Sequence, residues 1–252
     1  MAARLLLIED DASIARFVEI ALDGLPDHDA TAPAVDLTVV TSLRDARAAL
    51  ARGGWHLVIS DLMLPDGSAE SLLADGLALG HGAPKWVVFS AGVQEERRAT
   101  LATRGVAALL RKPVPLLELL DTIAGLLRQT PDVPPTAPPT APPAPAAVDP
   151  VQAHFGGDRA LFDSFRAGCL ERFADDLAQG QAAVASGDAQ ALRRVAHGLK
   201  AVLTLIGEPE LSAQARELED AAAGTPAGAP LPPGWEPLAF GLQGLRVRSG
   251  AA

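Results

Sequence analysis

The sequence predicts two folded domains of different classes, an α/β domain followed by an all-α domain. Within residues 1–130, short apolar runs alternate with amphipathic stretches, which is typical of a doubly wound fold on a parallel sheet. A Pro-rich segment follows, and beyond it the apolar residues recur only at helical spacing. Because 252 residues suffice for two ordinary domains, we place them at 1–128 and 151–252, with a linker at 129–150.

Five near-continuous apolar runs predict strands that are buried on both faces of a sheet. These runs are Arg4–Ile8, Leu37–Thr41, Leu57–Ser60, Trp86–Ser90 and Ala107–Leu110. We expect a (βα)5 domain with the strand order 2-1-3-4-5, which makes the first and third strands neighbours. The ligand site should then lie beyond the carboxyl ends of these strands.

Amphipathic segments separate the runs and predict five helices. They lie near Ser13–Leu22, Leu43–Arg52, Ala69–Leu79, Gln94–Arg104 and Pro115–Leu127. Pro115 suits a first helical turn, where its missing N–H group costs nothing. The polar segment Leu25–Asp36 is expected to be a solvated surface insertion.

The segment Pro131–Pro150 contains nine prolines, mixed mainly with Ala and Thr. This composition favours an extended polyproline II conformation and cannot form a core. At ~3.1 Å per residue the segment would span up to roughly 60 Å. We interpret it as a spacer, and a peptide-binding motif is the alternative.

The last hundred residues predict a small helical bundle. Asp158–Ala185 has the pattern of a long amphipathic helix, and Gly187-Asp188 ends it and caps the next. That second helix contains His197, and Glu210–Ala223 predicts a third. The tail supplies a short fourth helix near Pro237–Arg246.

Composition and charge exclude several classes of protein. The net charge is −10, and neither domain is basic, which weighs against nucleic-acid binding. The single cysteine, Cys169, excludes an internal disulfide framework, is typical of a cytosolic protein, and is expected to be a core residue. We find neither a signal peptide nor a run of ~18 apolar residues, so we expect a cytoplasmic protein without membrane insertion.

Carboxylates follow two strands that should be neighbours in the sheet. Glu9, Asp10 and Asp11 come after the first apolar run, and Asp61 comes after the third. Such clustered carboxylates repel one another unless they are protonated or bind a cation. A site with only oxygen ligands favours Mg²⁺.

Two further polar residues should point into the same crevice. Ser90 ends the fourth run, and Lys112 follows the fifth. A metal ion, a hydroxyl group and an ammonium group around one carboxylate form a phosphoryl-binding site.

On these motifs, residues 1–128 resemble the receiver domain of bacterial response regulators. The resemblance implies that Asp61 is the phospho-acceptor and that Ser90 and Lys112 contact the phosphoryl group. It also implies a cis peptide bond between Lys112 and Pro113. The Mg²⁺ ligands that it implies are Glu9, Asp10, Asp61 and the backbone carbonyl of Met63.

One position departs from the family. Leu109 stands three residues before Lys112, where receivers usually have an aromatic switch residue, and the chain has no Tyr. Because leucine cannot reproduce the swing of an aromatic ring, we expect phosphorylation to change the surface less than in a transcriptional regulator.

The second candidate site is His197, on the second helix of the bundle. Arg193, Arg194 and Lys200 share its helical face, so we expect an exposed imidazole framed by cations that stabilise a phosphoimidazole. A histidine that is merely solvated is the alternative.

The segment His197-Gly-Leu-Lys200, with Gly207 ten residues after the histidine, resembles the histidine phosphotransfer (HPt) domain. The resemblance covers about residues 151–223 and implies that His197 carries a phosphoryl group, supported by Lys200, Arg193 and Arg194. Ala201 stands where the family usually has glycine.

Together these resemblances imply a phosphorelay protein of a two-component system. Asp61 would receive phosphoryl from a phosphohistidine, and His197 would exchange it with a receiver aspartate, in the same chain or another. The expected partners are a sensor or hybrid histidine kinase and other receiver or HPt proteins. With no recognisable ATP-binding segment, we expect a phosphotransfer carrier and not an enzyme. We expect a monomer, because the helix that carries His197 needs a free face. A phosphoryl sink and a non-catalytic docking scaffold are the alternatives.

Overall fold

The structure is a computed structural model that describes residues 2–90, 95–128, 149–226, 228–248 and 250. It contains two compact units, Met1–Ala147 and Val148–Ala252. Most of the predicted linker, residues 129–148, lies outside the described residues. Its last two residues belong to a helix that we did not predict, α7 (Pro150–Phe155), where Asp149 is the N-cap and Pro150 the first residue.

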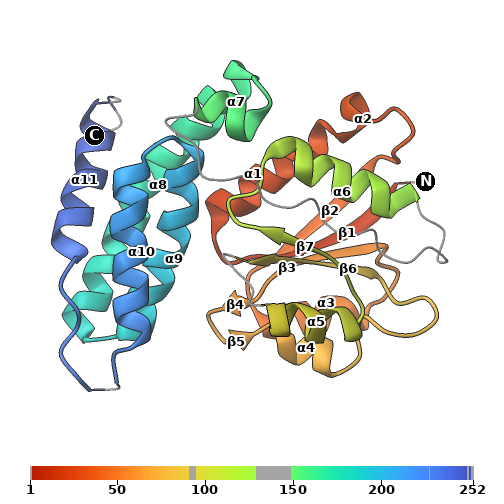
Figure 1. The fold of residues 1–252 in the computed structure, drawn as a ribbon, viewed down its shortest axis with the longest axis horizontal. Helices are drawn as coiled ribbons and strands as arrows, with labels where there is room; N and C mark the ends of the chain where they lie inside the picture. The colour runs from red at the N-terminus through yellow and green to blue at the C-terminus, as the bar shows by residue number, and fades with distance from the viewer. Residues whose placement is uncertain (1, 91–94, 129–148, 227, 249, 251–252) are drawn as a thin grey trace. The chain divides into compact units, whose positions relative to one another are not determined.

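A five-stranded parallel sheet organises the first unit (Figure 1). The strands are β1 (Ala3–Ile8), β2 (Val35–Val40), β3 (Leu57–Asp61), β6 (Lys85–Ser90) and β7 (Val106–Arg111). Their order is β2-β1-β3-β6-β7, so the expected order 2-1-3-4-5 is confirmed. Ile8 pairs with Ser60, and therefore the residues that follow β1 reach the same edge as Asp61.

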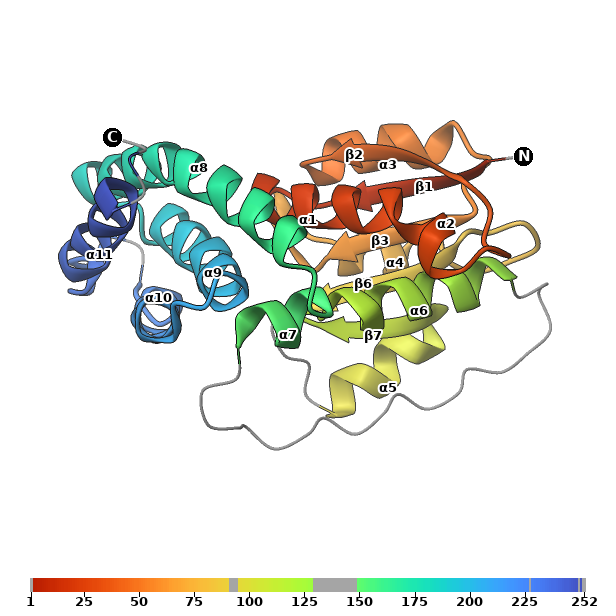
Figure 2. The same cartoon turned by 90° about the horizontal axis from the view of Figure 1, so that it is seen from above.

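Helices cover both faces of the sheet (Figures 1 and 2). One face carries α1 (Ala12–Asp23) and α6 (Leu116–Arg128), and the other carries α3 (Leu43–Ala51), α4 (Glu70–Ala74) and α5 (Glu95–Thr103). This two-sided cover explains why the strands read as continuous apolar runs and not as alternating ones. The doubly wound α/β class is confirmed.

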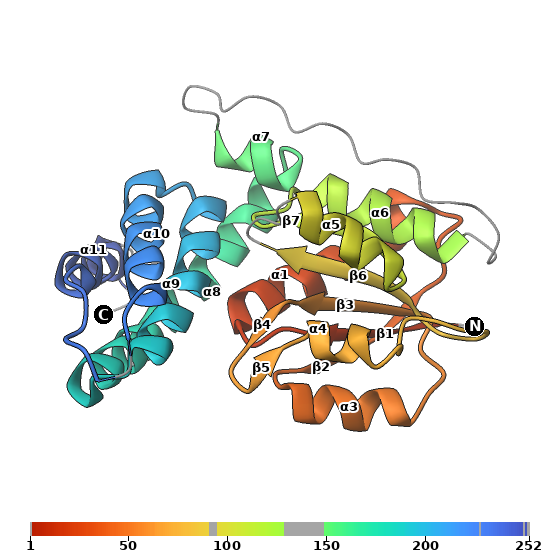
Figure 3. The same cartoon turned by 60° about the horizontal axis from the view of Figure 1, so that its bottom comes forward.

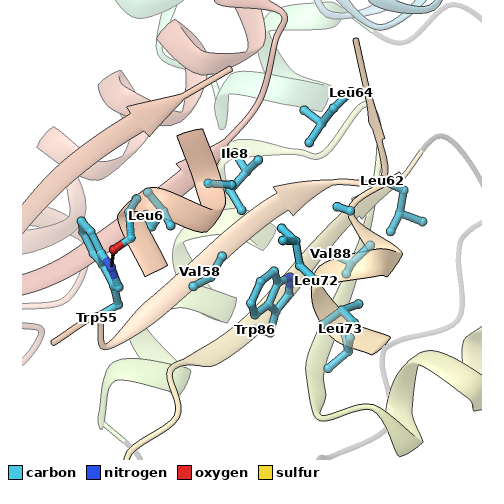
Figure 4. Close-up of a cluster of buried hydrophobic side chains, with 14 of the residues drawn as sticks. Leu6, Ile8, Trp55, Val58, Leu62, Leu64, Leu72, Leu73, Trp86 and Val88 are labelled. Carbon is cyan, nitrogen blue, oxygen red and sulfur yellow. Dashed lines mark hydrogen bonds between the residues drawn. The ribbon is translucent and has the colours of Figure 1, made fainter. Parts of the chain in front are cut away.

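A cluster of buried apolar side chains packs against one face of the sheet (Figure 4). It includes Leu6 and Ile8 of β1, Val58 of β3, and Trp86 of β6. Leu62 and Leu64, directly after Asp61, belong to the same cluster, and each is at most 5% exposed. The core therefore fixes the chain on both sides of Asp61.

Two local predictions in this unit were wrong. The helix expected at Ala69–Leu79 is only α4, because Gly76 adopts a left-handed φ of 75° and ends it. The segment Leu25–Asp36 is not merely solvated, since it begins with α2 (Leu25–His28), whose Leu25 is fully buried. Nε2 of His28 lies 2.7 Å from Oδ1 of Asp121, which ties the segment to α6.

The second unit is the predicted helical bundle, formed mainly by four helices (Figure 3). They are α8 (Arg159–Ser186), α9 (Ala189–Leu205), α10 (Pro209–Ala223) and α11 (Trp235–Arg248). Asp158 and Asp188 cap α8 and α9 through their carboxylates, as expected for N-cap residues. Gly187 ends α8 with a φ of 69°, and Cys169 is buried in the core as predicted.

The fourth helix is longer than predicted, and two glycines let it pack closely. A Cβ atom on Gly180 of α8 would lie 1.9 Å from the ring of Trp235. A Cβ atom on Gly241 of α11 would lie 2.2 Å from Leu211 of α10. A side chain at Gly180 would have to displace the Trp235 ring, and one at Gly241 would have to displace the end of the Leu211 side chain. None of the helices in the described part of the chain is long and apolar enough to cross a membrane.

Candidate functional sites

The carboxylates of Glu9, Asp10 and Asp61 meet at the carboxyl edge of the sheet. One oxygen from each lies within 4.8 Å of the others, although β1 and β3 are about fifty residues apart in sequence. Glu9 and Asp61 are 1% and 2% exposed. Asp11 does not join them, because its carboxylate accepts hydrogen bonds from Ser13 and Ile14 and caps α1.

Lys112 bridges two of these carboxylates. Its Nζ lies 2.6 Å from Oε2 of Glu9 and 2.6 Å from Oδ2 of Asp61. The backbone holds the lysine there, since its N–H donates to the carbonyl of Ser90 at 2.8 Å. The peptide bond between Lys112 and Pro113 is cis, as the resemblance implied. The side chain is buried, so the ammonium group has exchanged its hydration for these two carboxylates.

The electrostatics of the cluster favour a bound cation. Burial, with repulsion by Asp61, raises the pKa of Asp10 to about 6, although the positive charge of Lys112 lowers this pKa. Burial also raises the pKa of Glu9, which Lys112 lowers and Asp61 raises. For Lys112, burial lowers the pKa, but Asp61 and Glu9 outweigh it and raise the pKa well above its usual value. Three carboxyl groups thus share one ammonium group at this edge, and a bound cation would stabilise their charged forms.

Oxygen ligands within one coordination sphere are what Mg²⁺ requires in proteins, so the residues present fit that ion. Met63 follows Asp61 closely in β4 (Met63–Leu64), and its N–H donates to Oδ1 of Asp61 at 3.1 Å. Ser90 lies at the end of β6, directly after Phe89, which pairs with Asp61. The structure thus places all six receiver-site candidates on one edge of the sheet.

Leu109 lies in β7, half-buried against the apolar cluster. Because a packed leucine fills its position without a polar group, it offers no hydroxyl that could turn between core and surface. Leu109 therefore differs from the usual aromatic switch residue in chemistry as well as in size.

In the second unit, the expected exposure of His197 was wrong. Its side chain is only 14% exposed, and its Nδ1 lies 2.7 Å from Oε1 of Glu219 on α10. Lys200, one turn further along α9, forms an ion pair with Oε2 of the same carboxylate. Arg193 and Arg194 lie on the preceding turn of α9, half-buried. The imidazole is therefore held by an anion as well as framed by cations.

Glu219 is ionised in this arrangement. Burial alone would raise its pKa, but hydrogen bonds from His197 and Lys200 and their charges lower the pKa to about 2. An ionised carboxylate can only accept hydrogen bonds, so Nδ1 of His197 must donate the proton of that bond. In the neutral ring this leaves the lone pair on Nε2.

Glu219 was not among the site residues predicted from the sequence, although a signal was available. Ala215, Leu218 and Ala222 form the buried stripe of α10, and Glu219 falls within it. A glutamate in an apolar stripe needs a buried partner, and the cations of the preceding helix supply one.

Other contacts hold α9 against its neighbours. The carbonyl of Lys200 accepts from Oγ1 of Thr204 and from Oγ of Ser212, each at 2.9 Å. Gly207 has a φ of 81°, and a Cβ atom there would lie 2.7 Å from Pro150 of α7. The glycine ten residues after His197 is thus required for the turn and for the packing of α7.

Comparisons with known proteins found one family model and several solved structures that are similar to this chain. Residues 164–246 match the family model described as the Hpt domain. Among solved structures, the chain is similar to the non-phosphorylated HemR receiver domain from Leptospira biflexa, with 21% identity over 52% of this chain and 98% of that one and a TM-score of 0.44. A response regulator receiver domain protein from Methanospirillum hungatei gives 20% identity over 50% and 94%, with a TM-score of 0.44.

A signal receiver domain of an HD domain-containing protein from Pseudomonas fluorescens gives 20% identity over 50% and 87% of the two chains, with a TM-score of 0.43. Among curated proteins, none matches the chain. Residues 164–246 are thus similar to the Hpt domain family, and the first unit has a doubly wound fold with an acidic cluster beside Lys112.

Proposed function

We propose that this protein is a phosphorelay carrier that holds a phosphoryl group on Asp61 and, separately, on His197. The observation that carries the proposal is the bridge from Lys112 to Asp61 and Glu9, beside a third carboxylate. A buried ammonium group shared by two carboxylates is positioned to neutralise an incoming anion at the same place.

At the receiver site, a carboxylate oxygen of Asp61 attacks the phosphorus atom of a phosphohistidine on the donor. A P–O bond to Asp61 forms, the P–N bond of the donor breaks, and the imidazole leaves. Lys112 neutralises charge on the phosphoryl oxygens, and the Ser90 hydroxyl contacts one of them in this proposal. When bound, Mg²⁺ supplies charge neutralisation and orients the phosphoryl group, and Glu9, Asp10, Asp61 and the carbonyl of Met63 would hold it.

At the Hpt site, Nε2 of His197 is the nucleophile. Glu219 holds the proton on Nδ1 through the 2.7 Å bond, which places the lone pair of the neutral ring on Nε2. Nε2 attacks the phosphorus atom of an aspartyl phosphate, the P–N bond forms, and the aspartate carboxylate leaves as the P–O bond breaks. The proton stays on Nδ1, where the Glu219 carboxylate stabilises the positive charge of the phosphorylated ring.

The proposed partners follow from these two steps. The phosphohistidine belongs to a sensor or hybrid histidine kinase, or to another Hpt protein, and the aspartyl phosphate belongs to a receiver. The protein acts as a carrier in the cytoplasm and receives its phosphoryl group from these partners. Leu109 fits this role, because a carrier needs less surface rearrangement than a receiver that drives an output domain.

Labelling with acetyl phosphate tests the receiver half of the proposal. With Mg²⁺ present, we expect the full chain to take one phosphoryl group that is lost on Asp61→Asn substitution. The matched control is Asp11→Asn, which changes an acid beside the cluster that caps α1. Retention of label in Asp61→Asn would reject Asp61 as the acceptor.

A further inference from the structure

A short hairpin follows Asp61 and contains Met63. It consists of β4 (Met63–Leu64) and β5 (Gly67–Ser68), joined by Pro65 and Asp66. Its inner side is anchored in the core, because Leu64 is 5% exposed. The tip of the hairpin, Pro65 and Asp66, is exposed. A contact outside the core is therefore required to fix its position.

Asp66, at this tip, forms that contact. Its Oδ1 accepts from the N–H of Leu43 at 2.8 Å, and its Oδ2 accepts from the N–H of Arg44 at 3.0 Å. These two N–H groups begin α3, where the first turn of a helix lacks intrahelical partners. Burial would raise the pKa of Asp66, but the N–H groups of Leu43 and Arg44 lower it, so the carboxylate is charged when it meets the positive helix end.

The rest of the α3 N-terminus is satisfied without the hairpin. Oγ of Ser42 accepts from the N–H of Asp45 at 3.1 Å, and the carbonyl of Ser42 accepts from Ala46 at 2.9 Å. Asp66 therefore does more than cap a helix, since an ordinary N-cap residue is already present. Its two bonds connect α3 to a loop more than twenty residues away in sequence.

We propose that Asp66 is a positioning residue that fixes the β4–β5 hairpin, and through it the backbone of Met63, for binding of a divalent cation at the Glu9, Asp10 and Asp61 cluster. This inference rests on the proposed function. Gly67 pairs with Leu64 and Ser68 pairs with Met63, so the tip is connected to Met63 by the hairpin ladder. A displaced tip tilts this ladder and moves the Met63 carbonyl relative to the carboxylates.

The geometry of Gly67 supports a fixed tip. It has a φ of 140°, and a Cβ atom there would lie 3.0 Å from Cδ1 of Leu43. The hairpin thus approaches the start of α3 closely, in a backbone conformation that favours glycine. Leu43 thus meets the tip through both its backbone N–H group and its side chain, and Arg44 adds the second hydrogen bond.

Cation binding by the full-length protein tests this proposal, with Mn²⁺ as the probe because free and bound Mn²⁺ differ in their electron paramagnetic resonance signals. We expect Asp66→Ala to weaken Mn²⁺ binding about tenfold, the lower end of the effect of residues outside the coordination shell. Asp66→Asn, which keeps one acceptor oxygen, should fall between wild type and Asp66→Ala. The control is Ser42→Ala, which removes a cap from the same helix without touching the hairpin.

A second readout separates positioning from general damage. In phosphorylation by acetyl phosphate, Asp66→Ala should raise the Mg²⁺ concentration for half-maximal rate by the same factor and leave the rate at saturating Mg²⁺ unchanged. Equal binding by Asp66→Ala and wild type, or an equal loss in Ser42→Ala, overturns the role of Asp66. If wild type binds no Mn²⁺, or if Asp10→Asn binds as well as wild type, the cation site itself is rejected, which is a separate result.

Discussion

Replacement of Glu219 by glutamine is the most specific test of the contacts around His197 in the second unit. Glutamine has nearly the same shape, but it removes the negative charge that His197 and Lys200 share. The amide can also present an N–H group to Nδ1, which favours the opposite tautomer of the ring. The substitution therefore tests both the stability of the α9–α10 contact and the assignment of Nε2 as the nucleophile.

The size of the effect follows from the pKa of Glu219, which falls from 4.5 to about 2. At ~1.4 kcal/mol per pKa unit this corresponds to about 3 kcal/mol, and little of it is screened because the side chain is 11% exposed. Since the folded pKa is depressed, the contribution is present above pH 4.5 and is lost as the pH falls towards 2. At neutral pH it is therefore fully present.

Hydrogen exchange of the full chain measures this contribution without isolating a domain. We expect amides of α9 and α10 to exchange up to ~100-fold faster in Glu219→Gln, as about 3 kcal/mol requires. The control is Glu217→Gln, an exposed glutamate on the same helix. Nitrogen-15 NMR of the imidazole should show the Nδ1–H tautomer in wild type and its loss in Glu219→Gln. An Nε2–H tautomer in wild type, or equal exchange in the two variants, would refute the reasoning.

Three further predictions concern charge and packing. Mg²⁺ affinity should rise from pH 5 to pH 7, because Asp10, with a pKa of about 6, must lose its proton to bind the ion; titration of Asp10→Asn should show a weaker and flatter pH dependence. Lys112→Met should slow phosphorylation by acetyl phosphate yet tighten Mg²⁺ binding, since a cation 2.6 Å from Asp61 is removed; unchanged rates would contradict this. Gly180→Ala should lower the melting temperature of the bundle by overpacking against Trp235, at a cost of about 1–3 kcal/mol. Gly168→Ala on the same helix has open space and should stabilise it slightly; equal effects of the two would show that the contact with Trp235 does not matter.

The α/β fold was predictable because its strands are buried on both faces and read as uninterrupted apolar runs. Helix limits were less predictable where one residue decides them. The amphipathic pattern continues past Ala74, yet Gly76 ends α4 with a left-handed φ of 75°. The burial of Leu25 could not be predicted, because one apolar residue in a polar stretch has no periodicity that indicates packing on the core.

The candidate receiver site could be predicted because strand order alone brings Glu9, Asp10 and Asp61 to one edge. The environment of His197 could not, because its exposure depends on how α10 packs on α9, which is a tertiary contact. The same reason applies to Asp66, whose partners on α3 lie more than twenty residues away. Local sequence patterns thus gave the candidate acceptors Asp61 and His197, whereas the contacts of Glu219 and Asp66 required the structure.

We propose that one chain carries a phosphoryl group on Asp61 and another on His197. The most direct measurement incubates wild type, Asp61→Asn and His197→Gln with acetyl phosphate and Mg²⁺, and in parallel with a phosphorylated receiver, and follows the acid and alkali lability of the label. We expect an alkali-labile label that only Asp61→Asn loses and an acid-labile, alkali-stable label that only His197→Gln loses. Label of one kind only, or label that survives either substitution, would contradict it.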